Sequence, residues 1–144
     1  MKKKIKVLVI EDNEYYNNAL SNAIQQSVNP ILAKGNYQLV LRSITDANEY
    51  IRKIKSKELE CDYTAVFIDY YLGDEINAGH VIKLLKELSG DAMVVLLSQS
   101  KSISEKSDQI PFDYFVVKDK FAPALCGLYL QQYLENKYSV SLDQ

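Results

Sequence analysis

The alternation of short apolar runs with stretches of helical periodicity is the feature that most constrains the fold of this 144-residue chain. Five runs are rich in β-branched and aromatic residues, and the segments between them repeat apolar residues every three or four positions, as one face of a helix does. The predicted strands are 7–10, 37–44, 64–68, 92–97 and 114–117. We therefore expect an α/β protein with a doubly wound, five-stranded parallel sheet and right-handed crossovers.

The predicted helices lie between these strands. The first is expected to stop at Asn29–Pro30, because proline interrupts helical hydrogen bonding. Thr45 is expected to cap the second helix, and the third spans about 78–88 with Leu88 on its buried face. Residues 98–109 are polar and poorly patterned, so any helix there is weak. The last helix is predicted at 121–137.

Composition excludes several classes of protein. Seventeen basic and nineteen acidic residues give a net charge of −2, so we expect no direct nucleic-acid binding, which requires a basic surplus. No apolar run reaches the roughly 20 residues of a membrane span. The lysine-rich start is followed by too short an apolar stretch for a signal peptide, which predicts a cytoplasmic protein. Cys61 and Cys126 form no C-x-x-C pair and are expected to be free, buried thiols.

Chemically active residues follow four of the five strands. Glu11 and Asp12 follow the first strand, Asp69 the third, Ser98 the fourth and Lys118 the fifth. Because ligands bind at the carboxyl ends of parallel strands, these side chains are expected to share one edge of the sheet. Crowded carboxylates repel one another unless a cation lies between them, and Mg²⁺ is commonly held by carboxylates and phosphate oxygens. The set is consistent with phosphoryl transfer to a carboxylate.

The sequence resembles the receiver domains of two-component response regulators over about residues 4–138. The matching segments are VLVIEDN at 7–13, VFIDYYLG at 66–73, VVLLS at 94–98 and YFVVK at 114–118. The resemblance implies a flavodoxin-like, three-layer α/β/α fold with strand order 2-1-3-4-5. It also implies a receiver domain at 1–138 followed by a C-terminal tail at 139–144.

The resemblance further implies a metal site and a phosphoacceptor. Asp69 would accept a phosphoryl group from a histidine kinase or a histidine phosphotransfer protein. Mg²⁺ would be bound directly by Asp12 and Asp69, through water by Glu11, and by the backbone carbonyl of Tyr71. Such a domain is a phosphoacceptor in phosphorelay signal transduction that promotes its own phosphorylation and dephosphorylation, and it is not an enzyme in the usual sense.

Three further residues receive roles from the same resemblance. Lys118 and Ser98 would bind the phosphoryl group, and Ser98 would be the switch hydroxyl. Phe115 would be the aromatic residue whose rotamer follows the switch. The output would be contact with a downstream protein target or a homodimer through the helix 4–strand 5–helix 5 face. No output domain is expected after the last helix.

Three positions depart from the family pattern. Asp119 stands where the family usually has proline after the lysine, so a trans peptide bond is predicted there, because a cis bond without proline is costly. Gln99 is bulkier than the small residue that usually follows the switch hydroxyl. Tyr71 is large enough to screen an acyl phosphate from water, which predicts slow autodephosphorylation.

Two other functions remain open from the sequence. The missing proline at Asp119, the bulky Gln99, and Ser98 in place of the commoner threonine are also consistent with a receiver that acts as a phosphorylation-independent interaction domain. A phosphatase of the aspartyl-phosphate type is disfavoured, because Tyr71 occupies the place of its second acid. His80 is expected to be a surface or boundary residue, and Tyr129, Tyr133 and Tyr138 are considered as an exposed aromatic strip on the last helix.

Overall fold

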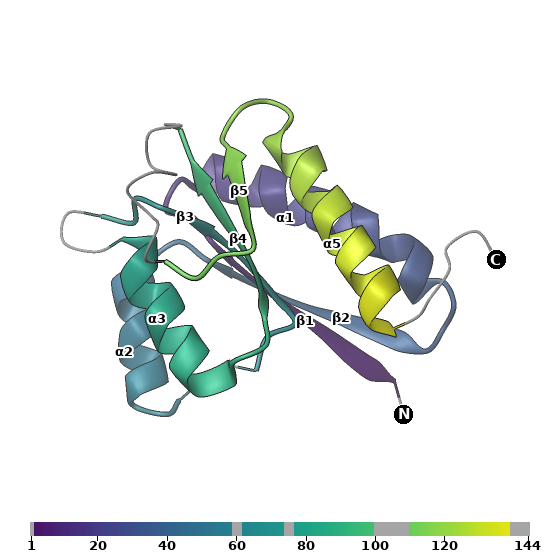
Figure 1. Ribbon diagram of the computed structural model, residues 1–144, viewed down its shortest axis with the longest axis horizontal. Helices are drawn as coiled ribbons and strands as arrows, with labels where there is room; N and C mark the ends of the chain where they lie inside the picture. Colours follow the sequence, from purple (N-terminus) through teal and green to yellow (C-terminus); the bar gives the residue numbers. More distant parts are fainter. Residues whose placement is uncertain (1, 59–61, 74–76, 100–109, 139–144) are drawn as a thin grey trace.

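A computed structural model describes residues 2–58, 62–73, 77–99 and 110–138. Five parallel strands form one sheet in the order β2-β1-β3-β4-β5, as Figure 1 shows. The strands are β1 (Lys3–Ile10), β2 (Tyr37–Ile44), β3 (Ala65–Asp69), β4 (Met93–Ser98) and β5 (Tyr114–Val117). The described helices are α1 (Glu14–Leu32), α2 (Ala47–Lys55), α3 (Ala78–Ser89) and α5 (Ala122–Tyr138).

The sheet is the middle of three layers. Helices α1 and α5 cover one face, and α2 and α3 cover the other (Figure 1). Each face has its own hydrophobic core, and successive residues of the central strands alternate between the two: Val7 and Val9 belong to the α1/α5 core, whereas Leu8 and Ile10 belong to the α2/α3 core. Burial on both faces explains why β3 and β4 read as continuous apolar runs. The predicted flavodoxin-like fold is confirmed.

Several predicted element boundaries were wrong. Pro30 does not stop α1, which continues to Leu32. A proline in the last turn removes one hydrogen bond, and the burial of Ile31 in the core retains that turn. The cap of α2 is Asp46, not Thr45, because the Asp46 side chain accepts a hydrogen bond from the Glu49 backbone N–H at 3.0 Å.

Two further differences concern surface positions. Strand β1 begins at Lys3 and not at residue 7, since it pairs with β2 along its whole length. Leu88 lies on α3 as predicted, but 55% of it is exposed, so it does not belong to the buried face.

Cys126 is buried and free, and burial raises the pKa of its thiol to about 12. Cys61, the weak helix predicted within 98–109 and the tail at 139–144 lie outside the described residues, apart from 98 and 99.

The sheet brings the predicted site residues to one edge. All five strands are parallel, so their carboxyl ends face the same side. Hydrogen bonds continue past the strand ends: the Tyr70 N–H donates to the Leu97 carbonyl, and the Lys118 N–H donates to the Ser98 carbonyl, both at 2.8 Å. These bonds fix the loops that carry the site. None of the described helices is long and apolar enough to cross a membrane.

Candidate functional site

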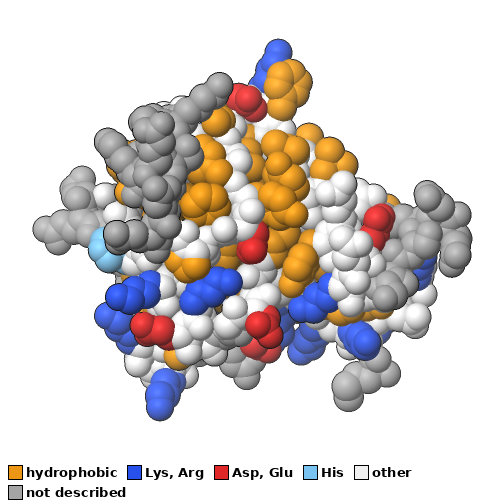
Figure 2. Space-filling view, in the orientation of Figure 1, with side chains coloured by type: hydrophobic (Ala, Val, Ile, Leu, Met, Phe, Trp, Pro, Cys, Tyr) orange, Lys and Arg blue, Asp and Glu red, His pale blue; other side chains and the backbone are white. Residues whose placement is uncertain are grey.

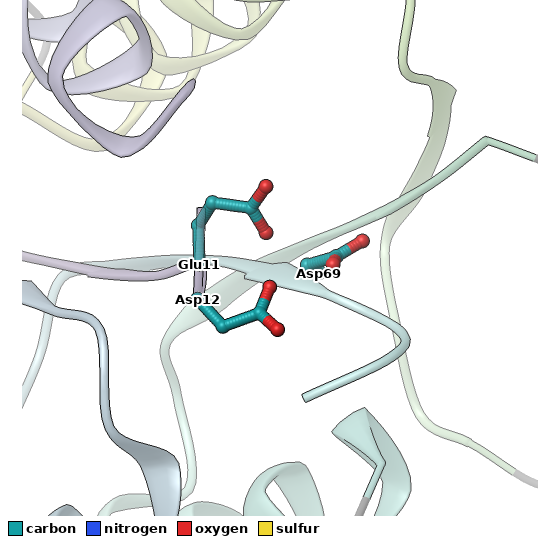
Figure 3. A group of neighbouring side chains, drawn as sticks. All are labelled: Glu11, Asp12 and Asp69. Carbon is teal, nitrogen blue, oxygen red and sulfur yellow. The ribbon is translucent and has the colours of Figure 1, made fainter. Parts of the chain in front are cut away.

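Three carboxylates meet where β1 and β3 end. Glu11 and Asp12 follow β1, Asp69 ends β3, and one oxygen of each lies within 4.8 Å of the others. Figure 3 shows the three side chains extending from neighbouring strand ends into a common space. Glu11 and Asp69 are buried, with 1% and 8% exposure, while Asp12 is exposed to solvent. Two of the three charges are therefore largely removed from water, which is costly without a positive partner.

Lys118 supplies part of the positive charge. Its Nζ lies 2.5 Å from Glu11 Oε1 and 3.6 Å from Asp69 Oδ2, and only 8% of its side chain is exposed. The same Nζ lies 4.5 Å from the centroid of the Tyr16 ring. One ammonium against three carboxylates leaves the cluster with an excess of negative charge.

This excess appears in the titration of Asp69. The pKa of Asp69 is raised to about 8, chiefly by burial and then by hydrogen bonding to Glu11 and the charges of Glu11 and Asp12, while the charge of Lys118 lowers it. Desolvation and like charges both disfavour the ionised form. A cation placed among these oxygens would favour the ionised carboxylate.

The donor set fits a hard divalent ion. Glu11 Oε2 is buried and has no hydrogen-bond partner among the described residues, although Oε1 of the same carboxylate is paired with Lys118. A buried charged oxygen without a partner is rare, and an ion or ordered water is the usual explanation. Carboxylate oxygens are the ligands that Mg²⁺ and Ca²⁺ prefer. The residues present therefore fit such an ion.

An open pocket of about 730 Å³ surrounds the cluster. Its lining includes six of the seven residues assigned from the sequence, and only Phe115 is not among them. The full lining is Glu11, Asp12, Asn13, Tyr15, Tyr16, Asp69, Tyr71, Ser98, Gln99 and Lys118. Phe115 is half-buried against the α2/α3 core, with its ring 6.2 Å from that of Phe112.

The departures from the family pattern are accommodated around this pocket. There is no cis peptide bond within the described ranges, so the trans bond predicted before Asp119 is confirmed. The Asp119 side chain accepts a hydrogen bond from the Phe121 backbone N–H at 2.8 Å. Lys118 nevertheless reaches Glu11 and Asp69. Tyr71 lines the pocket but is 58% exposed.

Sequence reasoning missed three residues that organise the first loop. Asn13 caps α1 by accepting a hydrogen bond from the Tyr16 N–H at 2.8 Å. Asn17 is buried, and its amide donates to the carbonyls of Glu11 and Ile44. The cap could have been recognised from an asparagine before a helix. Neither the role of Asn17 nor the position of the Tyr16 ring over Lys118 has a local sequence signal.

The structure also places His80 and the tyrosines of α5. His80 Nδ1 accepts a hydrogen bond from the Asn77 N–H at 3.1 Å in a capping box at the start of α3, which agrees with a boundary residue. The interpretation of Tyr129, Tyr133 and Tyr138 as an exposed strip on α5 was wrong, because all three are only partly exposed and pack against the core. The Tyr129 ring stacks on Tyr114 with centroids 4.1 Å apart.

Comparison with known proteins finds likeness in structure. No protein-family model matches the sequence, and no curated protein matches it either. Among solved structures, response regulator DrrB of Thermotoga maritima is 17% identical with a TM-score of 0.68, over 95% of this chain and 54% of that chain. The chain thus spans about half the length of that regulator.

Two other solved structures match along their whole length. TrrA of Thermotoga maritima, a response regulator solved in complex with Mg²⁺ and beryllofluoride, is 20% identical with a TM-score of 0.62, over 93% of this chain and 100% of that chain. A two-component response regulator of Cytophaga hutchinsonii is 25% identical with a TM-score of 0.60, over 94% of this chain and 99% of that chain. The chain therefore has the fold of a response-regulator receiver domain over nearly all of its length.

Proposed function

We propose that this chain is a phosphoacceptor receiver that takes a phosphoryl group onto Asp69 and passes the signal to another protein. One observation carries the proposal. Asp69 shares a pocket with the carboxylates of Glu11 and Asp12 and lies 3.6 Å from the Lys118 ammonium. A buried carboxylate beside a lysine and a metal-ligand set is suited to attack on phosphorus.

The donor would be a histidine kinase or a histidine phosphotransfer protein. An Asp69 oxygen attacks the phosphorus in line, the bond between phosphorus and the imidazole nitrogen breaks, and the imidazole takes up a proton. The product is an acyl phosphate on Asp69. Lys118, already within 3.6 Å of Asp69, is placed to bind an oxygen of the transferring group.

Mg²⁺ is the proposed metal of the site. Asp12 and Asp69 would bind it directly, Glu11 through water, and Tyr71 through its backbone carbonyl. When bound, a divalent ion supplies positive charge to the phosphoryl oxygens during transfer. TrrA, which has the same fold, was solved with Mg²⁺ and the phosphoryl mimic beryllofluoride, which supports this choice.

Ser98 and Phe115 form the proposed switch. Ser98 is fully buried at the end of β4 and lines the pocket. A phosphoryl group brings nearly two negative charges, which favour a position of the Ser98 hydroxyl facing those oxygens. Movement of Ser98 gives the Phe115 ring room to turn inward. The result is a shift in population between two arrangements.

The output would be a protein contact at the β5/α5 surface. Figure 2 shows hydrophobic side chains gathered over these elements. The exposed apolar residues there are Tyr114, Phe121, Leu125 and Leu128. A downstream protein target or a second copy of the chain would bind this face.

Binding of beryllofluoride tests the proposal. With Mg²⁺ present, ¹⁹F NMR should show a bound beryllofluoride signal for the wild type and none for Asp69→Asn or after chelation of the metal. Amide resonances of 98–99 and 114–118 should shift with that signal. A wild type without a bound signal would contradict the proposal and favour a receiver that acts as a phosphorylation-independent interaction domain.

A further inference from the structure

Tyr16 reaches the site from the first turn of α1. It is the third residue of that helix, and its N–H is fixed by the Asn13 cap at 2.8 Å. The cap holds the turn in place, and the face of the Tyr16 ring lies 4.5 Å from Lys118 Nζ. An ammonium at this distance from an aromatic face is within the range of a cation–π interaction.

The ring of Tyr16, and not its hydroxyl, makes the useful contact. The hydroxyl oxygen is buried and has no hydrogen-bond partner among the described residues. Burial, and to a smaller degree Cys126 and Glu11, raise the pKa of the Tyr16 phenol above its ordinary value, so the ring stays neutral. A neutral ring keeps the negative face that attracts a cation.

Lys118 has competing neighbours. Glu11 Oε1 is 2.5 Å from Nζ, whereas Asp69 Oδ2 is 3.6 Å away. The buried Glu11 carboxylate therefore draws the ammonium away from Asp69. The Tyr16 ring attracts the same ammonium without accepting a hydrogen bond at an oxygen. The N–H donors of Lys118 that Glu11 does not use therefore remain available to Asp69 and to a phosphoryl oxygen.

We propose that Tyr16 is a positioning residue for phosphoryl transfer: its ring face holds the Lys118 ammonium beside Asp69. The inference rests on the proposed function, because the positioned lysine serves the phosphoryl group. It adds a residue of α1 to a site that is otherwise built at the carboxyl ends of the strands. It also gives a role to this half-buried aromatic ring beside the pocket.

Substitutions at position 16 separate the ring from the hydroxyl. Phosphorylation by acetyl phosphate with Mg²⁺ is followed by intact mass for the wild type, Tyr16→Phe and Tyr16→Leu. Tyr16→Phe should retain the wild-type rate within about twofold, and Tyr16→Leu should be about tenfold slower, the range of a desolvated cation–π contact. Phenylalanines with increasing ring fluorination at position 16 should slow the reaction progressively, because fluorine weakens the negative face.

The matched control is another lysine–tyrosine pair. The Tyr133 ring lies 5.6 Å from Lys137 Nζ on α5, outside the pocket. Tyr133→Leu should leave the rate of phosphorylation unchanged. Three results would overturn the inference: a phosphorylation rate that does not change with ring fluorination, a Tyr16→Leu variant as fast as the wild type, or a Tyr16→Phe variant slowed as much as Tyr16→Leu.

A second readout needs neither metal nor phosphate. In the metal-free protein, the ring current of Tyr16 should shift the Lys118 ε-CH₂ proton resonances upfield. That shift should persist in Tyr16→Phe and disappear in Tyr16→Leu, and its absence from the wild type would overturn the inference. If the wild type shows the shift but accepts no phosphoryl group, the contact stands, while the proposed function and the positioning role that depends on it fail.

Discussion

Lys118 Nζ and Glu11 Oε1 lie 2.5 Å apart, with 8% and 2% of the two side chains exposed. The pair joins the loop after β5 to the end of β1, which are 107 positions apart in the sequence. A buried ion pair contributes little compared with apolar residues of the same size, but breaking it leaves one charge buried and alone. Lys118 is therefore required for folding stability as well as for the chemistry proposed here.

Replacement of Lys118 tests this structural role. Lys118→Ala should lower the free energy of unfolding by about 3 kcal/mol, because Glu11 is left buried without its cation. Urea denaturation measures the change. Lys120→Ala, at an exposed lysine two positions later, is the control and should cost less than about 0.5 kcal/mol. Equal effects of the two substitutions would contradict the pairing.

The pH dependence of stability reports the acidic cluster. The pKa of Asp69 is about 8 in the folded protein against an ordinary value of 3.8, so the folded state binds more protons than the unfolded state between these values. Stability of the metal-free protein should therefore fall as the pH rises from about 4 to about 8, and level off above.

Asp69→Asn replaces the titrating carboxyl group with a neutral amide and should therefore abolish this pH dependence of stability. By chemical denaturation with chelator present, the variant should be more stable than the wild type at pH 8 by roughly 5 kcal/mol, at about 1.4 kcal/mol for each unit of the pKa shift, and the difference should shrink towards pH 5. A difference in unfolding free energy that does not change with pH would contradict the raised pKa of Asp69. Addition of Mg²⁺ should stabilise the wild type more than the variant, since the ion favours the ionised carboxylate.

Asn17 connects the loop at the end of β1 to β2. Its amide donates to the Glu11 carbonyl at 3.1 Å and to the Ile44 carbonyl at 3.0 Å. Asn17→Ala should cost about 2 kcal/mol, because the buried Glu11 carbonyl loses the Asn17 donor and the Ile44 carbonyl is left with the Glu11 N–H. Asn18→Ala, at an exposed position of the same helix, should change stability little. An unchanged melting temperature in Asn17→Ala would argue against this role.

Much of the site could be predicted because its residues follow strands. Once the apolar runs are recognised as parallel strands, the positions of Asp69, Ser98 and Lys118 at one edge follow from topology. The continuous burial of β3 and β4 made those runs easy to recognise. The long-range proximity of Lys118 to Glu11 was therefore predictable without any contact information.

What the sequence did not predict depends on tertiary packing. Pro30 reads as a stop signal, yet the buried Ile31 holds the last turn of α1. Tyr16 has the spacing of a core residue, and only the approach of the β5–α5 loop places its ring against a lysine. Asn17 looks like any polar helix residue until the Ile44 carbonyl is placed beside it.

We expect Tyr71 to lengthen the lifetime of the proposed acyl phosphate. Its ring lines the pocket and packs edge-on against Tyr70 with centroids 4.9 Å apart, although it is 58% exposed. Partial screening of water predicts that Tyr71→Ala shortens the phosphoryl half-life about threefold. Loss of the phosphoryl mass after removal of the donor measures this. Tyr71→Phe retains the ring and should behave as the wild type. A half-life in Tyr71→Ala that rises or stays the same would rule out screening.

Transfer of a phosphoryl group to Asp69 can be tested by mapping the residue that is modified. Wild type and Asp69→Asn are incubated with acetyl phosphate, with Mg²⁺ or with chelator, and the acyl phosphate is reduced with borohydride before peptide mass analysis. We predict one phosphoryl group, only in the wild type with Mg²⁺, and reduction of residue 69 to homoserine. Modification that persists in Asp69→Asn, or a wild type that gains no phosphoryl group, would contradict it.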